Sequence, residues 1–191
     1  MNKKGMMVIL SAPSGCGKDT VFHEILNLRN DVVESVSATT RQPRTGEVDG
    51  VNYFFLSTKQ FKEMIENNAF LEYASYNNCY YGTPAKAAMD RVEEGKICFL
   101  IIECQGAKKV MKNCPEAVSI FLMPPSIETL ERRLKKRNTD SEEQIANRLR
   151  IAEEEINSSS VFDYIVVNNE LKKAVDEINE ILNNELEKRN A

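Results

Sequence analysis

The segment 11–20 combines small residues with a lysine and directly follows an apolar stretch at residues 6–10. It reads S-A-P-S-G-C-G-K-D-T, and the apolar pattern of a helix continues over residues 21–28. A strand, a glycine-containing turn and a helix in this order bring backbone N–H groups and a helix N-terminus to one anion. Lys18 adds a positive charge suited to the β and γ phosphates of a nucleotide. The segment therefore predicts a phosphate-binding loop.

Two positions depart from the usual G-x-x-x-x-G-K-[ST] pattern of such a loop. Ala12 stands where the first glycine is expected, and Asp19 stands where a magnesium-binding hydroxyl belongs. A carboxylate is favoured at a helix N-terminus, and Mg²⁺ between it and a polyphosphate makes their interaction attractive. We expect that Asp19 binds Mg²⁺ directly or through water, or that Thr20 supplies the hydroxyl.

Short, nearly continuous apolar runs alternate with helical patterns along the chain. The expected strands are residues 6–10, 35–38, 97–102, 118–123 and 164–167. Runs of this kind suit strands that are buried on both faces, so they predict an α/β fold with a parallel sheet flanked by helices. Ligands of such sheets collect at the carboxyl ends of the strands.

Two segments do not follow this alternation. Within residues 48–83, short strands at 53–55 and 70–76 surround a helix at 59–67, which predicts a small inserted antiparallel module. Residues 128–155 have a mostly helical pattern and are rich in arginine. An interruption at 138–140 divides this segment, and Thr139 or Ser141 is expected to cap the second helix. A packing helix is expected at 171–188.

The overall composition limits the classes of partner. The chain has 191 residues, enough for one domain with inserts, and a net charge of −4 at pH 7, which gives no sign of a nucleic-acid or membrane surface. The five cysteines include no C-x-x-C pair and there is one histidine, so we expect reduced thiols and a cytoplasmic location. Cys16 lies in the phosphate loop, where we expect alkylation to impair nucleotide binding. The sequence leaves monomer and homo-oligomer open.

A second phosphate site is indicated by two arginines in the segment 35–47. Arg41 and Arg44 lie three residues apart, and Pro43 stiffens the chain between them. Guanidinium groups bind a phosphate monoester with two hydrogen bonds, which a lysine ammonium cannot do in the same way. The alternative is a pair of solvated arginines in a surface loop.

The same segment carries a resemblance to a known family. It reads S-V-S-x-T-T-R-x-P-R-x-G-E and is followed by D-G-x-x-Y-x-F, which resembles guanylate kinase, the family that makes GDP from GMP with ATP in purine nucleotide metabolism. Shorter matches follow in order at residues 70–72, 80–83, 95–96, 105–106, 124–126, 148–149 and 167–168. The resemblance implies one P-loop kinase domain over residues 4–186. Its core would lie at about 4–34, 88–130 and 156–188, its GMP-binding module at about 35–87 and its helical lid at about 131–155.

The resemblance also implies the residues of two nucleotide sites. Those for ATP are Ala12, Pro13, Ser14, Gly15, Cys16, Gly17, Lys18, Asp19, Thr20 and Asn168. Those for the GMP phosphate are Arg41, Arg44, Tyr53 and Tyr81, and those for the base are Ser37, Glu72 and Thr83. Guanine presents N1–H and N2–H donors and an O6 acceptor, so a carboxylate with hydroxyl groups suits it, whereas adenine has no N1–H.

The implied reaction needs positioning and positive charge. The attacking phosphate oxygen is already anionic, so no general base is required. Lys18 and Arg41 would serve as catalytic cations, and the resemblance assigns Arg137 and Arg148 to a lid that closes on ATP and excludes water. Arg132 and Arg133 receive no assignment, and Lys135, Lys136 and Arg150 are expected to be solvated.

The chain departs from the family pattern D/E-I-D-x-Q-G at the end of the strand at 97–102. Ile101 replaces the first acid and Glu103 the second. Glu103 therefore either accepts from guanine, orients the metal through water, or has a buried structural role. Asn138 in place of a lid glycine and Asn169 in place of an acid are milder departures.

Two other functions remain open. One is a non-catalytic guanylate-kinase-like module that binds phosphorylated peptides, although such modules usually lose the phosphate loop that Gly15, Gly17 and Lys18 represent here. The other is a kinase for a different small phosphate ester, which the departures at Ile101 and Glu103 permit. The residues that favour GMP are Ser37, Arg41, Arg44, Glu72, Tyr81 and Thr83.

Overall fold

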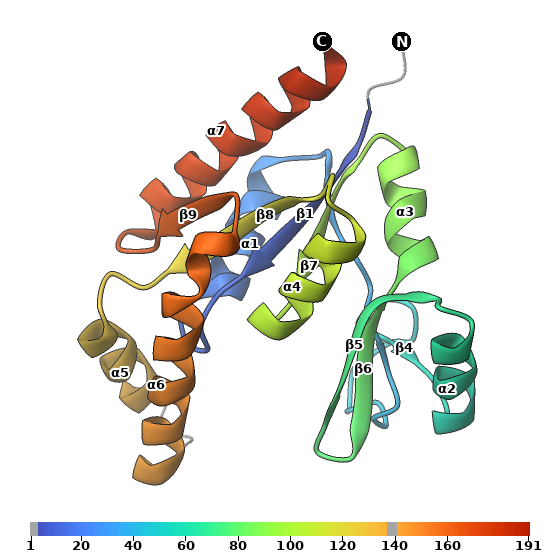
Figure 1. Ribbon diagram of the computed structural model, residues 1–191, viewed down its shortest axis with the longest axis horizontal. Coiled ribbons are helices and arrows are strands. Elements are labelled where there is room, and N and C mark those ends of the chain that lie inside the picture. The colour runs from blue at the N-terminus through green and yellow to red at the C-terminus, as the bar shows by residue number, and fades with distance from the viewer. Residues whose placement is uncertain (1–3, 137–140) are drawn as a thin grey trace.

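The computed structural model describes residues 4–136 and 141–191. Within them, the larger sheet has five strands in the order β2-β7-β1-β8-β9, and every neighbouring pair is parallel (Figure 1). These strands are β1 Met6–Ser11, β2 Val32–Glu34, β7 Ile97–Ile101, β8 Val118–Met123 and β9 Tyr164–Val167. All six residues of the central strand β1 are buried. The predicted parallel sheet is confirmed.

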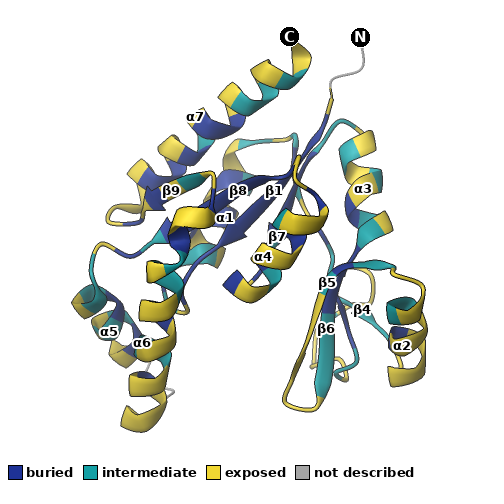
Figure 2. Ribbon diagram, in the orientation of Figure 1, coloured by how far each residue is buried: buried dark blue, intermediate teal, exposed yellow. Residues whose placement is uncertain are grey.

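Helices cover both faces of this sheet, and alternate residues of β1 face opposite layers. Met6, Val8 and Leu10 pack with α1 (Lys18–Leu28) and α7 (Leu171–Asn190). Met7 and Ile9 pack with α3 (Ala85–Glu93) and α4 (Cys104–Asn113). Figure 2 shows the buried strands between exposed outer helix faces. Two-sided burial explains why the strands are continuous apolar runs rather than alternating ones. None of the described helices is long and apolar enough to cross a membrane.

A second, smaller sheet has the order β4-β3-β6-β5. Its strands are β3 Ala38–Thr39, β4 Phe54–Phe55, β5 Phe70–Tyr76 and β6 Cys79–Pro84, with α2 Thr58–Glu66 beside them. Asn77 and Asn78 form the β5–β6 turn with φ angles of 48° and 60°, which asparagine tolerates better than most residues. The sheet is mixed: β3 and β5 run antiparallel to β6, but β3 and β4 are parallel. The expected antiparallel module is therefore confirmed for two pairs, whereas the β3–β4 pair is parallel because the loop 40–53 returns the chain to the end from which β3 started.

The expected strand at residues 35–38 is also wrong. Val32 and Val33 pair with β7 in the larger sheet, and the N–H of Ser35 makes a further bond to the carbonyl of Phe99 (2.9 Å). Ala38 already pairs with Phe54 and Gly82 in the smaller sheet. The chain thus changes sheets within this segment, so it cannot continue as one strand.

Two helices project from the larger sheet on the side opposite the smaller sheet (Figure 1). They are α5 Ile127–Lys136 and α6 Glu142–Asn157, followed by the 3₁₀ turn η1 Ser159–Val161. Ser141 caps α6 as expected: its hydroxyl accepts from the N–H of Gln144, and the Gln144 side chain accepts from the Ser141 N–H (2.8 Å). The other candidate cap, Thr139, lies outside the described residues.

All five cysteines are free thiols, and four of them are buried. Cys16 is fully buried, and its thiol donates to the carbonyl of Leu122 (3.3 Å). Burial raises the pKa of the Cys16 thiol to about 12, despite the lowering effect of the Arg133 and Lys18 charges. The expectation that Cys16 is open to alkylation is therefore wrong, since the side chain faces the core rather than the nucleotide side of the loop.

Thiol labelling of the native protein tests this arrangement. We expect iodoacetamide at mildly alkaline pH to modify Cys79, which is partly exposed on β6, at least about tenfold faster than Cys16, because the thiolate is the reactive form. Peptide mass spectrometry over a time course gives both rates. Protein unfolded in guanidinium provides the control, in which all five thiols react. Equal labelling of Cys16 and Cys79 in the native protein contradicts the prediction.

Candidate active site

The phosphate loop connects the end of β1 to the start of α1. Gly15 and Gly17 have φ angles of 89° and 91°, a region that glycine occupies without strain. Gly17 is the N-cap of α1, and its carbonyl accepts from the N–H of Val21 (3.0 Å). Lys18 is the first helical residue. The first N–H groups of α1, which have no helical partner, therefore face the loop together with the positive end of the helix dipole.

Lys18 forms an ion pair with Glu103 (3.0 Å between Nζ and Oε1). The two residues meet because β1 and β7 are parallel neighbours, and each residue follows the carboxyl end of one of these strands. The Lys18 side chain is 14% exposed and that of Glu103 is 69% exposed. A buried structural role for Glu103 is thereby excluded.

A small pocket of about 140 Å³ lies on the loop. Its lining comprises all the expected loop residues and Glu103: Ala12, Pro13, Ser14, Gly15, Cys16, Gly17, Lys18, Asp19, Thr20 and Glu103. Asp19, Thr20 and Glu103 are among its lining residues and carry side-chain oxygens, the ligand type that Mg²⁺ prefers. These three residues thus fit a divalent cation that is also bound by phosphates.

A larger pocket of about 450 Å³ lies between the smaller sheet and α4. Five of the residues expected to bind GMP line it: Ser37, Tyr53, Glu72, Tyr81 and Glu103. The other lining residues are Ala74, Ser75, Tyr76, Gly82, Ile101, Ile102, Gln105, Gly106 and Lys109. Glu103 borders both this pocket and the phosphate-loop pocket, so the two cavities share a wall.

The carboxylate of Glu72 is held from two sides. The hydroxyl of the buried Thr83 donates to its Oε1 (2.9 Å), across the β5–β6 pairing. Its Oε2 lies against Gly106, where an added Cβ would approach it to 2.9 Å. Burial raises the pKa of Glu72, whereas the Thr83 bond and the positive charge of Lys109 lower it. Thr83 therefore acts in this pocket through Glu72.

Arg41 is held by an acid that sequence reasoning did not single out. Both oxygens of Glu47 accept from its guanidinium (2.8 and 3.0 Å), and the guanidinium carbon lies 5.5 Å from the centre of the Tyr53 ring. The N–H of Arg44 also donates to Glu47 (2.7 Å), while the Arg44 side chain is exposed. Hydrogen bonds from Arg41 are the main cause that holds the pKa of Glu47 below its usual value. The position of Glu47 at the end of the arginine-containing segment 35–47 is the sequence feature that could have indicated this ion pair.

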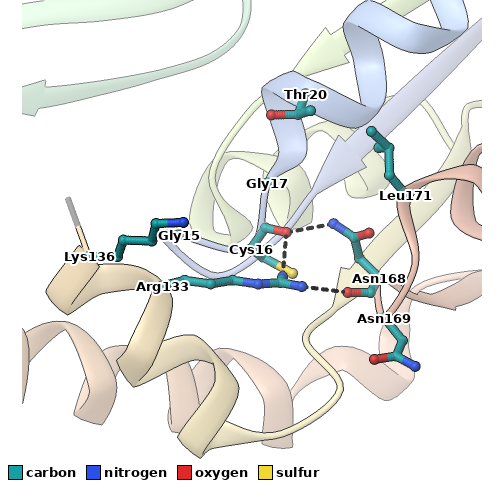
Figure 3. Close-up of a pocket in the computed structure, with 9 residues that line it drawn as sticks. All are labelled: Gly15, Cys16, Gly17, Thr20, Arg133, Lys136, Asn168, Asn169 and Leu171. Carbon is teal, nitrogen blue, oxygen red and sulfur yellow. Dashed lines mark hydrogen bonds between the residues drawn. The ribbon is translucent and has the colours of Figure 1, made fainter.

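A third pocket of about 360 Å³ lies beside the loop, between α5 and the segment after β9 (Figure 3). Its lining residues are Gly15, Cys16, Gly17, Thr20, Arg133, Lys136, Asn168, Asn169 and Leu171. The Asn168 amide donates to the carbonyl of Cys16 (2.8 Å), so the structure brings Asn168 to the phosphate loop.

Arg133 closes this arrangement from α5. Its guanidinium donates to the carbonyls of Cys16 (3.3 Å) and Asn168 (3.0 Å), as Figure 3 shows. Leu134, the next residue on α5, is buried against Gly15, where an added Cβ would approach it to 2.7 Å. Sequence reasoning left Arg133 unassigned, because nothing distinguishes it from the adjacent Arg132.

Of the other expected cations, Arg41 and Arg44 are not among the described residues that line these three pockets. Arg148 lies half-buried on α6 and is not among the described residues that line any of the three. Arg137 lies outside the described residues.

Proteins of similar sequence and structure show which family has this combination of fold and pockets. A sequence model of the guanylate kinase family matches residues 4–185. A guanylate kinase from Caldanaerobacter subterraneus is 47% identical over 95% of this chain and 88% of its own length. One from Clostridioides difficile is 47% identical over 97% of this chain and 91% of its own length. The crystal structure of guanylate kinase from Anaplasma phagocytophilum covers 96% of this chain and 87% of its own, with 34% identity and a TM-score of 0.74. The chain therefore belongs to the guanylate kinase family, the ATP:GMP phosphotransferases.

Proposed function

We propose that this chain transfers the γ-phosphoryl group of ATP to GMP between the phosphate loop and the pocket beside α4. One observation carries the proposal: Glu103 borders both pockets and is bonded to Lys18. A donor on the loop and an acceptor in the larger pocket would therefore meet at a shared wall. Direct transfer requires this proximity, because positioning supplies much of the rate acceleration.

On the donor side, the loop N–H groups, the α1 N-terminus and Lys18 hold the ATP phosphates. The pocket beside Arg133, Asn168 and Leu171 is the proposed adenine site, since it adjoins the loop and has both polar and apolar lining. Arg133 and Asn168 bond to the carbonyl of Cys16. They thus hold that carbonyl away from the phosphates, so that the loop presents N–H groups to them.

On the acceptor side, Glu72 accepts from N1–H and N2–H of guanine. The Thr83 hydroxyl fixes its carboxylate, and Ser37 adds a hydroxyl in the same pocket. Arg41, Arg44, Tyr53 and Tyr81 bind the GMP phosphate. Because Glu47 bonds to Arg41 through both oxygens, it orients the plane of the guanidinium for a second anion.

Catalysis in this proposal rests on cations rather than on a base. Lys18 and Arg41 lie on the donor and acceptor sides, and Arg137 and Arg148 act from a lid formed by residues 131–155. Residues 35–87 form the GMP-binding module between parts of the core. The free thiols suit a reducing compartment, which supports a cytoplasmic location.

Mg²⁺ is the cofactor that the proposal includes. Asp19, Thr20 and Glu103 fit it as oxygen donors on the loop pocket. No group of three or more His, Cys, Asp or Glu residues among those described is arranged to hold a metal, so the ATP phosphates would supply most of its ligands. When bound, Mg²⁺ neutralises charge on the β and γ phosphates.

The acceptor preference tests the proposal directly. In a coupled ADP-release assay with ATP and each of GMP, dGMP, AMP, CMP and UMP, we expect GMP and dGMP to react and AMP to be at least about 1000-fold poorer in kcat/KM, because Glu72 would face an acceptor at adenine N1. Lys18→Ala is expected to lower kcat by about 100-fold or more while the circular dichroism spectrum is unchanged. GMP binding without turnover would favour the peptide-binding module, and preference for another acceptor would favour the other kinase.

The role of Asp19 is separable from that of the rest of the loop. If its carboxylate helps to bind Mg²⁺, Asp19→Ser will alter the Mg²⁺ concentration that gives half-maximal rate, and Asp19→Asn will do so more strongly because it retains the shape without the charge. Titration of Mg²⁺ at fixed ATP and GMP measures both variants. A metal requirement and a rate equal to those of the parent chain would contradict a role of Asp19 in binding the metal.

The contact between Gly106 and Glu72 predicts that a substitution at Gly106 changes the KM for GMP but not the KM for ATP. In Gly106→Ala the new Cβ displaces the Glu72 carboxylate, since it would lie 2.9 Å from Oε2. Loss of one hydrogen bond to a charged group costs about 1.5–3 kcal/mol, so the KM for GMP should rise by about tenfold to 100-fold. The KM for ATP and the melting temperature serve as controls, because alanine in a helix does not destabilise it relative to glycine. An unchanged KM for GMP would show that the carboxylate moves aside freely.

A further inference from the structure

Lys109 lies on the face of α4 that packs against β5. Its ammonium donates to the carbonyl of Tyr73 (3.0 Å) and lies 5.7 Å from the centre of the Tyr73 ring. Tyr73 directly follows Glu72 on β5. The positive charge is therefore fixed to the backbone unit next to the residue that carries the carboxylate.

The same face of α4 meets the Glu72 side chain. Gly106 and Lys109 are three residues apart, a spacing that places them on one side of a helix. Gly106 leaves room for Oε2 of Glu72, and Lys109 borders the pocket one turn further along. The carboxylate thus lies between the positive end of the α4 dipole and a lysine.

The other titratable side chains that line this pocket among the described residues are neutral or negative. Tyr53, Tyr76 and Tyr81 border the pocket from the smaller sheet and the loop before it, and Glu103 borders it from the start of α4. Among the described residues that line the pocket, Lys109 is the only cation. Burial raises the pKa of Glu72 and Lys109 lowers it, as does the bond from Thr83. A protonated carboxyl would point its O–H donor at the N–H donors of guanine. Only the charged form, which accepts through both oxygens, therefore suits the base.

We propose that Lys109 is a positioning residue that keeps the Glu72 carboxylate charged and oriented toward the base of the acceptor nucleotide. This inference rests on the proposed function, in which Glu72 binds guanine. It assigns to Lys109 an effect on acceptor binding that depends on pH and leaves the phosphate loop unchanged. A lysine that only anchored β5 through the Tyr73 carbonyl would have no such dependence on pH.

The pH dependence of kcat/KM for GMP tests the inference, measured from about pH 5 to about pH 9 at saturating ATP and Mg²⁺. Lys109→Met keeps the aliphatic stem and removes the charge. We expect the acidic limb of its profile to move upward by about one pH unit, because the pKa of Glu72 rises further without the neighbouring cation. The GMP phosphate itself titrates at about pH 6, but equally for every variant, so the difference between two profiles reports the protein group.

Two variants serve as controls. Lys109→Arg retains the charge and should restore the parent profile, and Lys112→Met, an exposed position on the same helix, should leave it unchanged. The KM for ATP should be the same throughout. Coincident acidic limbs for Lys109→Met and the parent chain would overturn the inference. A rise in KM for GMP by the same factor at every pH would overturn it as well, since that result identifies an anchor of β5 or a direct contact to GMP.

Glu72→Gln separates this inference from the proposed function. The variant should raise the KM for GMP and remove the part of the acidic limb that belongs to the protein. If it leaves the KM for GMP unchanged, Glu72 does not bind guanine and the proposed base site itself is wrong. If Glu72→Gln raises the KM while Lys109→Met leaves the profile unchanged, the base site stands and only the role of Lys109 is refuted.

Discussion

The parallel pairing of β1 with β7 sets the distance between the two halves of the site. Leu10 is aligned with Ile101, so the phosphate loop and the start of α4 leave the sheet next to one another. Lys18 and Glu103 lie on these two segments and are joined by a 3.0 Å ion pair. Both strands are buried between helical layers, so their separation cannot change without disturbing a closely packed core. The pockets on either side depend on this fixed spacing.

The helix α4 connects the phosphate loop at the edge of the larger sheet to strand β5 of the smaller sheet. Its N-cap, Glu103, bonds to Lys18, whereas Lys109 and Asn113 donate to backbone carbonyls of β5. The residue paired with Lys18 and the two residues that bond to the backbone on either side of Glu72 therefore lie on one ten-residue helix and its N-cap. A site supported by a helix is positioned more accurately than one supported by loops. Packing thus determines how the Glu72 carboxylate lies relative to the phosphate loop.

The parts of the site that the sequence predicts are those with a local signal. The phosphate loop is such a case, because its strand, glycines, Lys18 and helix follow one another directly. Partners from distant segments have no such signal, so the bonds of Arg133 to the carbonyls of Cys16 and Asn168 could not be predicted. Residues 35–38 were expected as one strand because apolar periodicity does not indicate where a chain passes between sheets. The burial of Cys16 was missed for a similar reason: a motif does not tell which side of the loop a thiol faces.

An acidic chain that binds two anionic nucleotides must rely on local rather than net charge. Interactions between exposed charges are screened beyond about 8 Å at physiological ionic strength, so the net charge of −4 has little influence within the pockets.

Lys18 and Arg41 are each paired with a glutamate, but the two glutamates differ. Glu103 is 69% exposed and bonds through one oxygen, so a phosphate can take its place at Lys18. Glu47 is 19% exposed and bonds through both oxygens, so its pairing with Arg41 fixes the plane of the guanidinium. The Glu103 pair is therefore more accessible to a competing anion than the Glu47 pair, which is more buried and bonded at two points.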